Sequence, residues 1–324
     1  NNQKLSACFT FNGLSKTKVE KLEAGDIIAI SGIEGVEIGD TISDNDNPEP
    51  LPRIEIDSPT VSMYFQVNNS PFAGKEGKYL TSRHLGDRLK RETLINVSLE
   101  IIPTNSPDTF EVCGRGELQM AVLIETTRRE GYEFMVSKPI VITIEENGEK
   151  LEPVEHVYLD LPEQNVGTIT EKLSERKGVM VNLQNNGSGR AMLEFKIPAR
   201  GLIGFRSQYL TDTKGAGIMN TLFDSYKPWF GPIPKRSSGV LVGDRQGNVT
   251  SFAYSAMAER GILFTSVGTE VYEGMIIGER NRLGDLDVNI TKEKKLTNMR
   301  AAGSDSTVTL RPPKIMSLDE CIEF

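Results

Sequence analysis

The hydrophobic pattern of residues 59–139 switches between strand and helix periods in an order typical of one small fold. "TVSMYFQVNN" (60–69) alternates apolar and polar residues, which predicts a half-buried strand. "KYLTSRHLGDRLKRETL" (78–94) and "GELQMAVLIETTRREG" (116–131) have helical spacing, and we expect the second to bury Leu118, Val122 and Leu123. Further strands are predicted in "INVSLEII", "DTFEVCG" and "YEFMVSK". The order β-α-β-β-α-β is that of the split βαβ, or ferredoxin-like, unit.

The same order returns in residues 140–226. "EPVEHVYLDL" (152–161) predicts a strand, "NVGTITEKLSERKG" (165–178) a helix, and "VMVNLQ" with "RAMLEFKIP" a hairpin across "NNGSG". "GLIGFRSQYLTDTKG" (201–215) predicts one helix that buries Leu202, Phe205 and Tyr209, spaced i, i+3 and i+7. "GIMNTLFDSY" predicts the last strand. Residues 59–139 and 140–226 are therefore predicted to be two tandem ferredoxin-like domains of an α+β protein.

The chain on either side of these two domains has a β-rich pattern. In residues 1–43, glycine turns separate short Ile/Val runs, which predicts the end of a β-barrel, and residues 44–58 concentrate Pro, Asn and Asp as linkers do. Residues 227–324 predict a separate β-dominated domain in which "SGVLVGDRQGNVTSFAY" (238–254) forms a hairpin. "MSLDECIEF" predicts a short helix with a capping box of Ser317 and Glu320.

Composition narrows the class of protein. The 324 residues are 38% apolar and 25% charged, and no apolar run approaches the roughly 20 residues that cross a bilayer, so no membrane partner is expected. The chain starts without Met or a secretory signal, and its three scattered cysteines suit a reducing compartment, which predicts a piece of a cytoplasmic protein. The chain has 37 Lys and Arg residues and 45 Asp and Glu residues, so its formal net charge is −8. This negative charge argues against a nucleic-acid coat protein and against a DNA partner.

The motifs of common catalytic and metal sites do not occur in this sequence. "AGKEGKY" (73–79) has the wrong spacing for a P-loop and no Ser or Thr after Lys78, and no G-x-G-x-x-G follows a predicted strand. His84 and His156 are the only histidines, and neither accompanies a nucleophile motif or metal-ligand spacing. We therefore expect no catalytic residue, metal or cofactor site within this chain.

Three short stretches are basic although the chain is acidic. Residues 74–91 carry six Lys/Arg against two acids (+4), residues 186–206 carry four against one (+3), and residues 291–300 carry four against one (+3). Any single stretch could be a solvated surface, but three together indicate binding of phosphate, above all of structured RNA. The candidate RNA-binding residues are Lys75, Lys78, Arg83, Arg200, Arg206, Lys292, Lys294, Lys295 and Arg300.

Several motifs resemble a known family. "GRGELQMAVLIETTRREGYEFMVSKP" (114–139) is similar to the signature of the third domain of translational GTPases such as elongation factor G. "SPFAGKEGKY", "IPARGLIGFRSQYLTDTKGAG" and "KKLTNMRAAGSD" resemble more narrowly the BipA/TypA family. The resemblance covers essentially all 324 residues in a consistent order.

The resemblance implies a ribosome-binding function. Residues 1–43 would be the end of barrel domain II, the tandem domains would be domains III and V, and residues 227–324 the family's own C-terminal domain. The GTP and Mg²⁺ site would lie in a G domain absent from this chain. The family acts in ribosome assembly, stress or low-temperature growth and virulence regulation. Its basic loop, matched here by Lys292, Lys294, Lys295 and Arg300, faces rRNA and A-site tRNA. A monomer associated with cytoplasmic ribosomes is expected.

Two other interpretations remain open from the residues. The chain could be a fragment of another ribosomal GTPase, such as elongation factor G, the LepA-like factor or a ribosomal protection protein. It could also be a metabolic regulator whose paired ferredoxin-like domains bind a small effector between them, because a fold does not determine a function.

Overall fold

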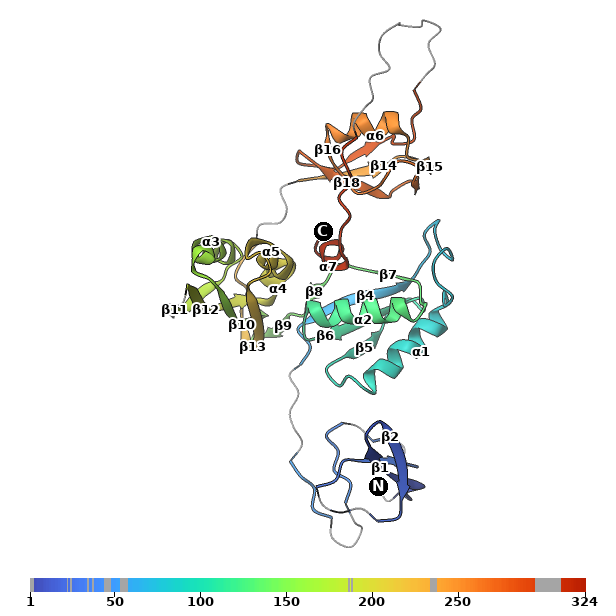
Figure 1. Ribbon diagram of the computed structural model, residues 1–324, viewed down its shortest axis with the longest axis vertical. Coiled ribbons are helices and arrows are strands. Elements are labelled where there is room, and N and C mark those ends of the chain that lie inside the picture. The colour runs from blue at the N-terminus through green and yellow to red at the C-terminus, as the bar shows by residue number, and fades with distance from the viewer. Residues whose placement is uncertain are drawn as a thin grey trace, which may run out of the picture.

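The computed structural model is an α+β protein with several separate sheets (Figure 1). It describes residues 3–21, 23, 25–33, 35–36, 38–43, 48–52, 58–185, 187, 189–233, 238–294 and 310–324. At the N-terminus, β1 (Ala7–Asn12), β2 (Ser15–Val19) and β3 (Ile28–Ser31) form an antiparallel sheet in the order β2-β1-β3. No closed barrel is formed by the residues described here.

The first ferredoxin-like unit has the predicted order of elements. These are β4 (Val61–Val67), α1 (Ser82–Thr93), β5 (Glu100–Pro103), β6 (Thr109–Gly114), α2 (Glu117–Arg129) and β7 (Phe134–Val136). The antiparallel sheet runs β5-β6-β4-β7, and β8 (Ile140–Val141) also pairs with β4. Met63 and Phe65 of β4 and Leu85 and Leu89 of α1 are buried in its core, as their spacing predicts.

The predicted core face of α2 is wrong for two of three residues. Leu123 is buried, but Leu118 and Val122 are 52% and 58% exposed. Met120 and Ile124 pack into the core beside Leu123 instead. The helix therefore turns a neighbouring stripe of residues toward the sheet.

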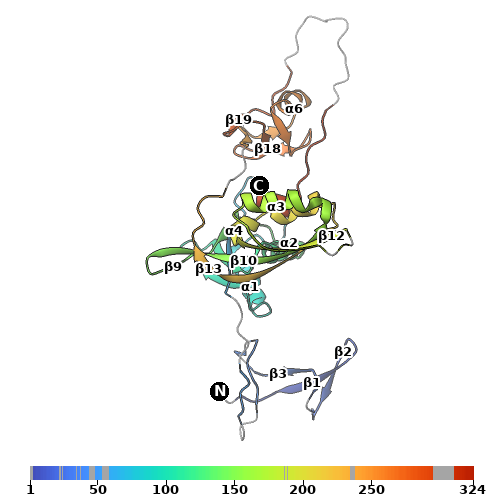
Figure 2. The ribbon, with the colours of Figure 1, turned by 90° about the vertical axis from the view of Figure 1, so that its left-hand side faces the viewer.

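The second ferredoxin-like unit repeats this arrangement. Its elements are β9 (Ile144–Glu146), β10 (Glu149–Pro162), the 3₁₀ turn η1 (Glu163–Asn165), α3 (Val166–Glu175), β11 (Val179–Asn185), β12 (Arg190–Pro198), α4 (Ala199–Leu202), α5 (Phe205–Asp212) and β13 (Ile218–Pro228). The sheet runs β11-β12-β10-β13, and Figure 2 shows α3 and α4 on one side of it. Leu202, Phe205 and Tyr209 lie in the core, which confirms their predicted packing.

The predicted helix over 201–215 is in fact two short helices. The chain leaves the helical conformation at Ile203, which has ψ 120°, and α5 begins after Gly204. Gly204 adopts φ +73°, a left-handed conformation that glycine adopts without steric cost. The break places Leu202 and Phe205 in one core although they belong to different helices.

The C-terminal unit is a third α+β body. It comprises β14 (Val240–Gly243), β15 (Gly247–Asn248), α6 (Ser251–Ala258), β16 (Gly261–Leu263), β17 (Glu270–Val271), β18 (Ile276–Arg280) and β19 (Leu286–Val288). One sheet runs β16-β18-β14-β19, and β15 pairs with β17. The hairpin predicted over 238–254 is wrong. Thr250 caps a helix there by accepting a hydrogen bond from the Ala253 N–H, and β14 pairs with the distant strands β18 and β19.

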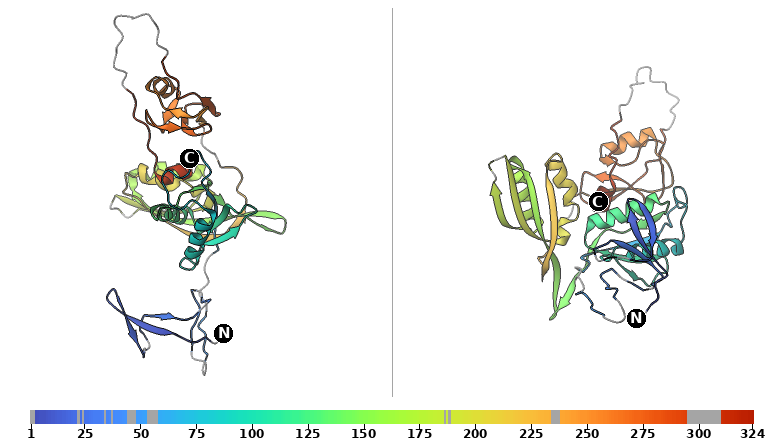
Figure 3. Two further views of the ribbon diagram at one scale, coloured as in Figure 1. Left: turned by 90° about the vertical axis from the view of Figure 1, so that its right-hand side faces the viewer. Right: turned by 60° about the horizontal axis from the view of Figure 1, so that its bottom comes forward.

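The short helix α7 (Leu318–Glu323) joins the C-terminal unit to the first unit. Its predicted capping box is present, because Ser317 and Glu320 each bond the other's backbone N–H. Ile322 packs into the core of the first unit, while the ring of Phe324 meets Phe264 of the C-terminal unit at 5.2 Å. In the left view of Figure 3, α7 lies in red between the ferredoxin-like units and the C-terminal unit.

Candidate functional site

The segment of residues 68–80, called here the 68–80 loop, is held on the carboxylate of Glu133. Glu133 Oε1 accepts from Asn68 Nδ2 (2.6 Å) and the Gly74 N–H (2.8 Å), and Oε2 from the N–H groups of Gly77 (2.9 Å) and Glu76 (3.1 Å). Burial opposes ionisation of Glu133, but these hydrogen bonds outweigh it and lower the pKa of the carboxyl. Sequence reasoning missed Glu133, because no motif marks a side chain that organises a loop 57 residues away.

The end of the loop is fixed to the segment between α2 and β7. The N–H groups of Lys78 and Tyr79 both donate to the Gly131 carbonyl (2.8 and 3.2 Å), and the Glu133 N–H donates to the Tyr79 carbonyl (3.2 Å). The side chain of Lys78 is exposed, and no ion pair involves it among the described residues. The backbone of Lys78 is therefore fixed, while its side chain extends into solvent.

Lys75 has a different role from the one its motif suggested. Its Nζ lies 2.5 Å from Glu270 Oε2 of the C-terminal unit and 4.3 Å from the ring centroid of Phe72. Phe72 in turn meets Tyr272 edge to face at 5.0 Å. Lys75 therefore connects the 68–80 loop to the C-terminal unit, and its charge is partly matched there.

Arg83 lies in the first turn of α1 with its side chain 90% exposed. Its nearest acid is Asp87, with 3.9 Å between Nε and Oδ2, and no acidic residue occupies this turn. A cation at this end of a helix opposes the helix dipole, at a cost of about 0.3–1 kcal/mol. The positive end of the helix and Arg83 together make this surface attractive to an anion.

Three aromatic rings lie among these cations. Tyr79, which is 40% exposed, has its ring 4.7 Å from that of Tyr132 and 5.2 Å from that of His84. Arg91 Nη2 donates to the Tyr132 hydroxyl at 3.0 Å. We call the set Lys78, Tyr79, Arg83, His84, Arg91 and Tyr132 the basic aromatic surface.

Arg88 belongs to the basic stretch 74–91 but not to this surface. Its guanidinium bonds both carboxylate oxygens of Glu130 and one of Glu92, and it is buried. The hydrogen bond with Glu130 contributes most to raising the Arg88 pKa. Arg88 offsets only one of the two negative charges, but it holds both carboxylates in ion pairs and so weakens their repulsion of an approaching phosphate.

Arg200 is an internal residue, which corrects its predicted exposure to phosphate. Its Nε lies 2.5 Å from Oε2 of Glu152, whose side chain is fully buried, and its guanidinium bonds the Gly231 carbonyl and lies 3.8 Å from the centroid of the Trp229 ring. The adjacent Gly201 does not admit a ligand either. A Cβ there would lie 2.7 Å from the Arg176 carbonyl oxygen, so this glycine serves internal packing.

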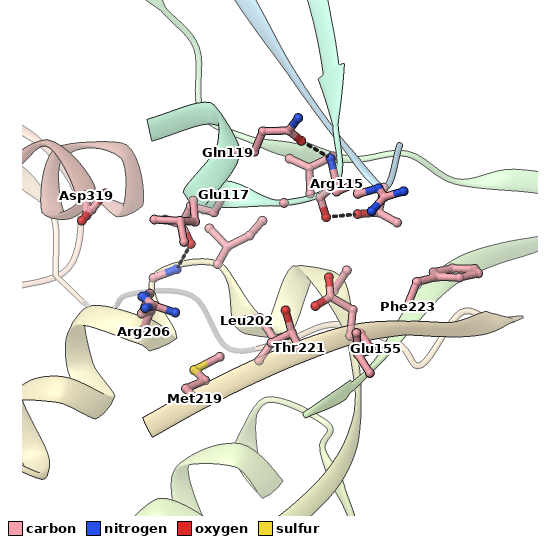
Figure 4. A pocket seen from close by; sticks show the side chains of 18 of the residues that line it. Arg115, Glu117, Gln119, Glu155, Leu202, Arg206, Met219, Thr221, Phe223 and Asp319 are labelled. Carbon is pink, nitrogen blue, oxygen red and sulfur yellow. Dashed lines mark hydrogen bonds between the residues drawn. The ribbon is translucent and has the colours of Figure 1, made fainter. Parts of the chain in front are cut away.

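Arg206 is exposed and lines a cavity of about 300 Å³ between the two ferredoxin-like units (Figure 4). Across it, Glu117 Oε2 accepts a hydrogen bond from the Gly204 N–H at 2.9 Å. Burial raises the pKa of Glu117, and it raises that of Glu155 to about 6 despite a hydrogen bond from Thr221. Cations and carboxyls therefore share this cavity, and Arg206 lies apart from the basic aromatic surface.

The third basic stretch is described only in part. Lys292 and Lys294 are exposed, and the Lys292 carbonyl accepts a 2.5 Å hydrogen bond from the hydroxyl of Thr250, the residue that caps α6. Lys295 and Arg300 lie outside the described residues. Lys292 and Lys294 therefore remain candidate RNA contacts.

The described residues contain no group of three or more His, Cys, Asp or Glu side chains that could hold a metal ion. His156 lies beside Glu194, with 3.2 Å between Nε2 and Oε2, and its ring stacks on Tyr158. No helix within the described part of the chain is long and apolar enough to span a membrane.

Comparisons with known proteins match the chain in two segments and as a whole. Residues 149–237 match the family described as elongation factor G C-terminus, and residues 238–324 match TypA/BipA C-terminal domain. The "Large ribosomal subunit assembly factor BipA" of Bacillus subtilis (strain 168) is 48% identical over 322 residues, which cover 99% of this chain and 53% of that protein. The protein of the same name from Salmonella typhimurium is 48% identical over 326 residues, covering 100% of this chain and 53% of its own length.

A solved structure from Thermus thermophilus aligns with a TM-score of 0.43 and 14% identity, over 71% of this chain and 51% of that one. The chain spans about half the length of the curated relatives that it matches. Its two consecutive matches, together with nearly half-identical relatives along its whole length, show that it belongs to the TypA/BipA family.

Proposed function

We propose that this chain is the ribosome-docking part of a translation-factor GTPase that acts in assembly of the large ribosomal subunit. The relatives described above carry the name of such an assembly factor and match this chain from end to end. The observation that carries the proposal is the basic aromatic surface, which gathers exposed cations on an ordered stretch of backbone although the chain has a net charge of −8.

Docking would be electrostatic and would recognise shape. Lys78 and Arg83 would contact phosphates and 2′-hydroxyls of folded rRNA, which position a protein without reading base edges. Lys292 and Lys294 would approach rRNA or tRNA near the A site. GTP with Mg²⁺ would bind in the part of the protein outside this chain and would favour the conformation that docks. No catalytic residue is proposed within this chain.

Other properties of the family follow from the resemblance alone. They are roles in stress, low-temperature growth and virulence regulation, a monomeric state, and association with cytoplasmic ribosomes. For this chain they remain predictions.

The proposal is tested by co-sedimentation with large ribosomal subunits during a salt titration. Replacing both Lys78 and Arg83 by Glu should weaken binding. It should also reduce the magnitude of the slope of log K against log salt concentration, by roughly one unit or less for each phosphate that the variant no longer neutralises. A matched control reverses Lys18 and Arg282, two exposed cations elsewhere on the chain, which changes the net charge equally. Equal losses in both pairs would mean that only net charge matters and would contradict a defined docking surface.

Two alternatives are less well supported. A fragment of another ribosomal GTPase does not account for the match of residues 238–324 to the TypA/BipA C-terminal domain. An effector-binding regulator would use the cavity between the ferredoxin-like units, but the relatives matched over the whole chain are named assembly factors.

A further inference from the structure

We propose that the basic aromatic surface binds RNA at an unpaired nucleotide, whose base stacks on Tyr79 while Lys78 and Arg83 hold the flanking phosphates. The inference rests on the proposed function and narrows it, because it names single-stranded or bulged RNA as the element recognised. It assigns a binding role to an aromatic residue that was not among the candidate RNA-binding residues.

Two rings of the aromatic cluster, those of Tyr79 and His84, are exposed, and Tyr79 is the one that both other rings contact. Tyr132 lies against Tyr79 with an interplanar angle of 35°, and His84 meets it edge to face at 77°. Tyr132 is also held by Arg91, whereas no hydrogen bond involves the Tyr79 hydroxyl within the described residues. With 40% of its surface exposed, Tyr79 is supported by two rings and still offers apolar area to solvent.

The position of Tyr79 is set before any ligand arrives. Its N–H and carbonyl both bond backbone groups of the segment after α2, and Glu133 fixes the loop that precedes it. A ring that is already ordered loses little conformational entropy on binding, so more of the stacking energy contributes to affinity.

The charges around the ring favour an anionic ligand. Lys78 and Arg83 are exposed on either side of Tyr79 in sequence, and Arg91 donates a hydrogen bond to the Tyr132 hydroxyl. The nearby acids are largely engaged, since Glu133 accepts four hydrogen bonds and Glu92 and Glu130 pair with Arg88. Asp87 and Glu76 remain exposed, and Asp87 is only 3.9 Å from Arg83.

An unpaired base fits this combination better than an RNA duplex or an acidic peptide. Bases inside a duplex are already stacked and cannot reach Tyr79, and an acidic peptide would need the cations but not the ring. Stacking of a base on an aromatic side chain contributes about 1–3 kcal/mol by alanine substitution. Aromatic rings beside cations are the usual arrangement in proteins that bind single strands.

The test measures binding of the 324-residue chain to a labelled ten-nucleotide oligoadenylate and to an RNA duplex of ten base pairs. Tyr79→Ala should weaken single-strand binding about 5- to 140-fold and leave duplex binding nearly unchanged. Tyr79→Phe should restore it to within about twofold, because the ring and not the hydroxyl stacks. Tyr64→Ala, which removes another partly exposed tyrosine, is the matched control and should bind as the wild type does.

The outcomes separate this inference from the proposed function. Stacking on Tyr79 is overturned if Tyr79→Ala binds the oligonucleotide like the wild type, or if it loses as much affinity for the duplex as for the single strand. In either case the proposed docking on the ribosome still stands if ribosome binding depends on Lys78 and Arg83. If polyglutamate displaces the oligonucleotide and binds the wild type and Tyr79→Ala with equal affinity, the basic aromatic surface is assigned to an acidic protein partner instead. The Tyr79→Phe variant and thermal unfolding of each variant exclude loss of the fold as the cause.

Discussion

Glu133 and Gly77 are packed so closely that only glycine fits at position 77. The Gly77 N–H donates to Glu133 Oε2 at 2.9 Å, and a Cβ built on Gly77 would lie 2.4 Å from the Cβ of Glu133. The contact joins the loop that carries Lys78 and Tyr79 to the segment that follows α2. The shape of the proposed RNA-binding surface therefore depends on a glycine that does not touch the ligand.

Gly77→Ala should displace the loop. The added methyl group would have to move the backbone near Glu133, and overpacking of this kind costs about 1–3 kcal/mol. Urea unfolding should show that loss together with weaker RNA binding. Gly116→Ala is the control, because its φ of 173° is extended and a Cβ there has no neighbour within 4 Å. Equal stabilities for the two variants would show that the loop gives way at no cost.

Glu133→Gln should destabilise the chain in a pH-dependent way. The hydrogen bonds that Glu133 accepts lower its pKa in the folded state, so its ionised form stabilises the fold. The difference between wild type and variant should be present at pH 7 and above. It should shrink as the pH falls below about 4.5 and through the lower folded pKa. Urea unfolding at several pH values measures it, and a difference that grows toward acid would contradict this role.

Removing one partner of the pair Arg200–Glu152 should be among the most damaging changes in the second unit. Arg200→Gln would leave a fully buried carboxylate without its cation, which costs about 3–5 kcal/mol. Arg206→Gln, on α5 and exposed, should change the free energy of unfolding by less than about 0.5 kcal/mol. A similar small loss for both would make Arg200 a candidate RNA contact again.

The tandem order of elements was predictable because strands and helices have different hydrophobic periods, and each of the predicted ferredoxin-like units switches period several times. The core face of α2 was not predictable, because the helix has two apolar stripes. Leu118 and Val122 form one stripe, and Met120, Leu123 and Ile124 form the other. Only the position of the sheet decides between them. Local apolar pattern alone cannot make that choice.

Long-range ion pairs explain why counting local charge found the basic regions but not the free cations. Arg200 pairs with an acid 48 residues away, and Lys75 with one 195 residues away. Neither acid falls in the stretches whose net charge pointed to RNA. The hairpin predicted over 238–254 failed for a similar reason, since the partners of β14 are β18 and β19.

Glu155 should destabilise the fold at neutral pH, because its ionised form is unfavourable in the folded state, whereas the ionised form of Glu133 is favourable. Burial raises its pKa to about 6 from 4.5, so stability linked to its neutral form is full below pH 4.5 and is lost as the pH rises through 6. The shift corresponds to about 2 kcal/mol. Glu155→Gln should therefore be more stable than the wild type by up to about that amount at pH 8, and no more stable near pH 4.

Urea unfolding across this range, with the exposed Glu149→Gln of the same strand as control, measures the effect. A constant difference between wild type and Glu155→Gln over the whole range would mean that folding does not shift the pKa of Glu155.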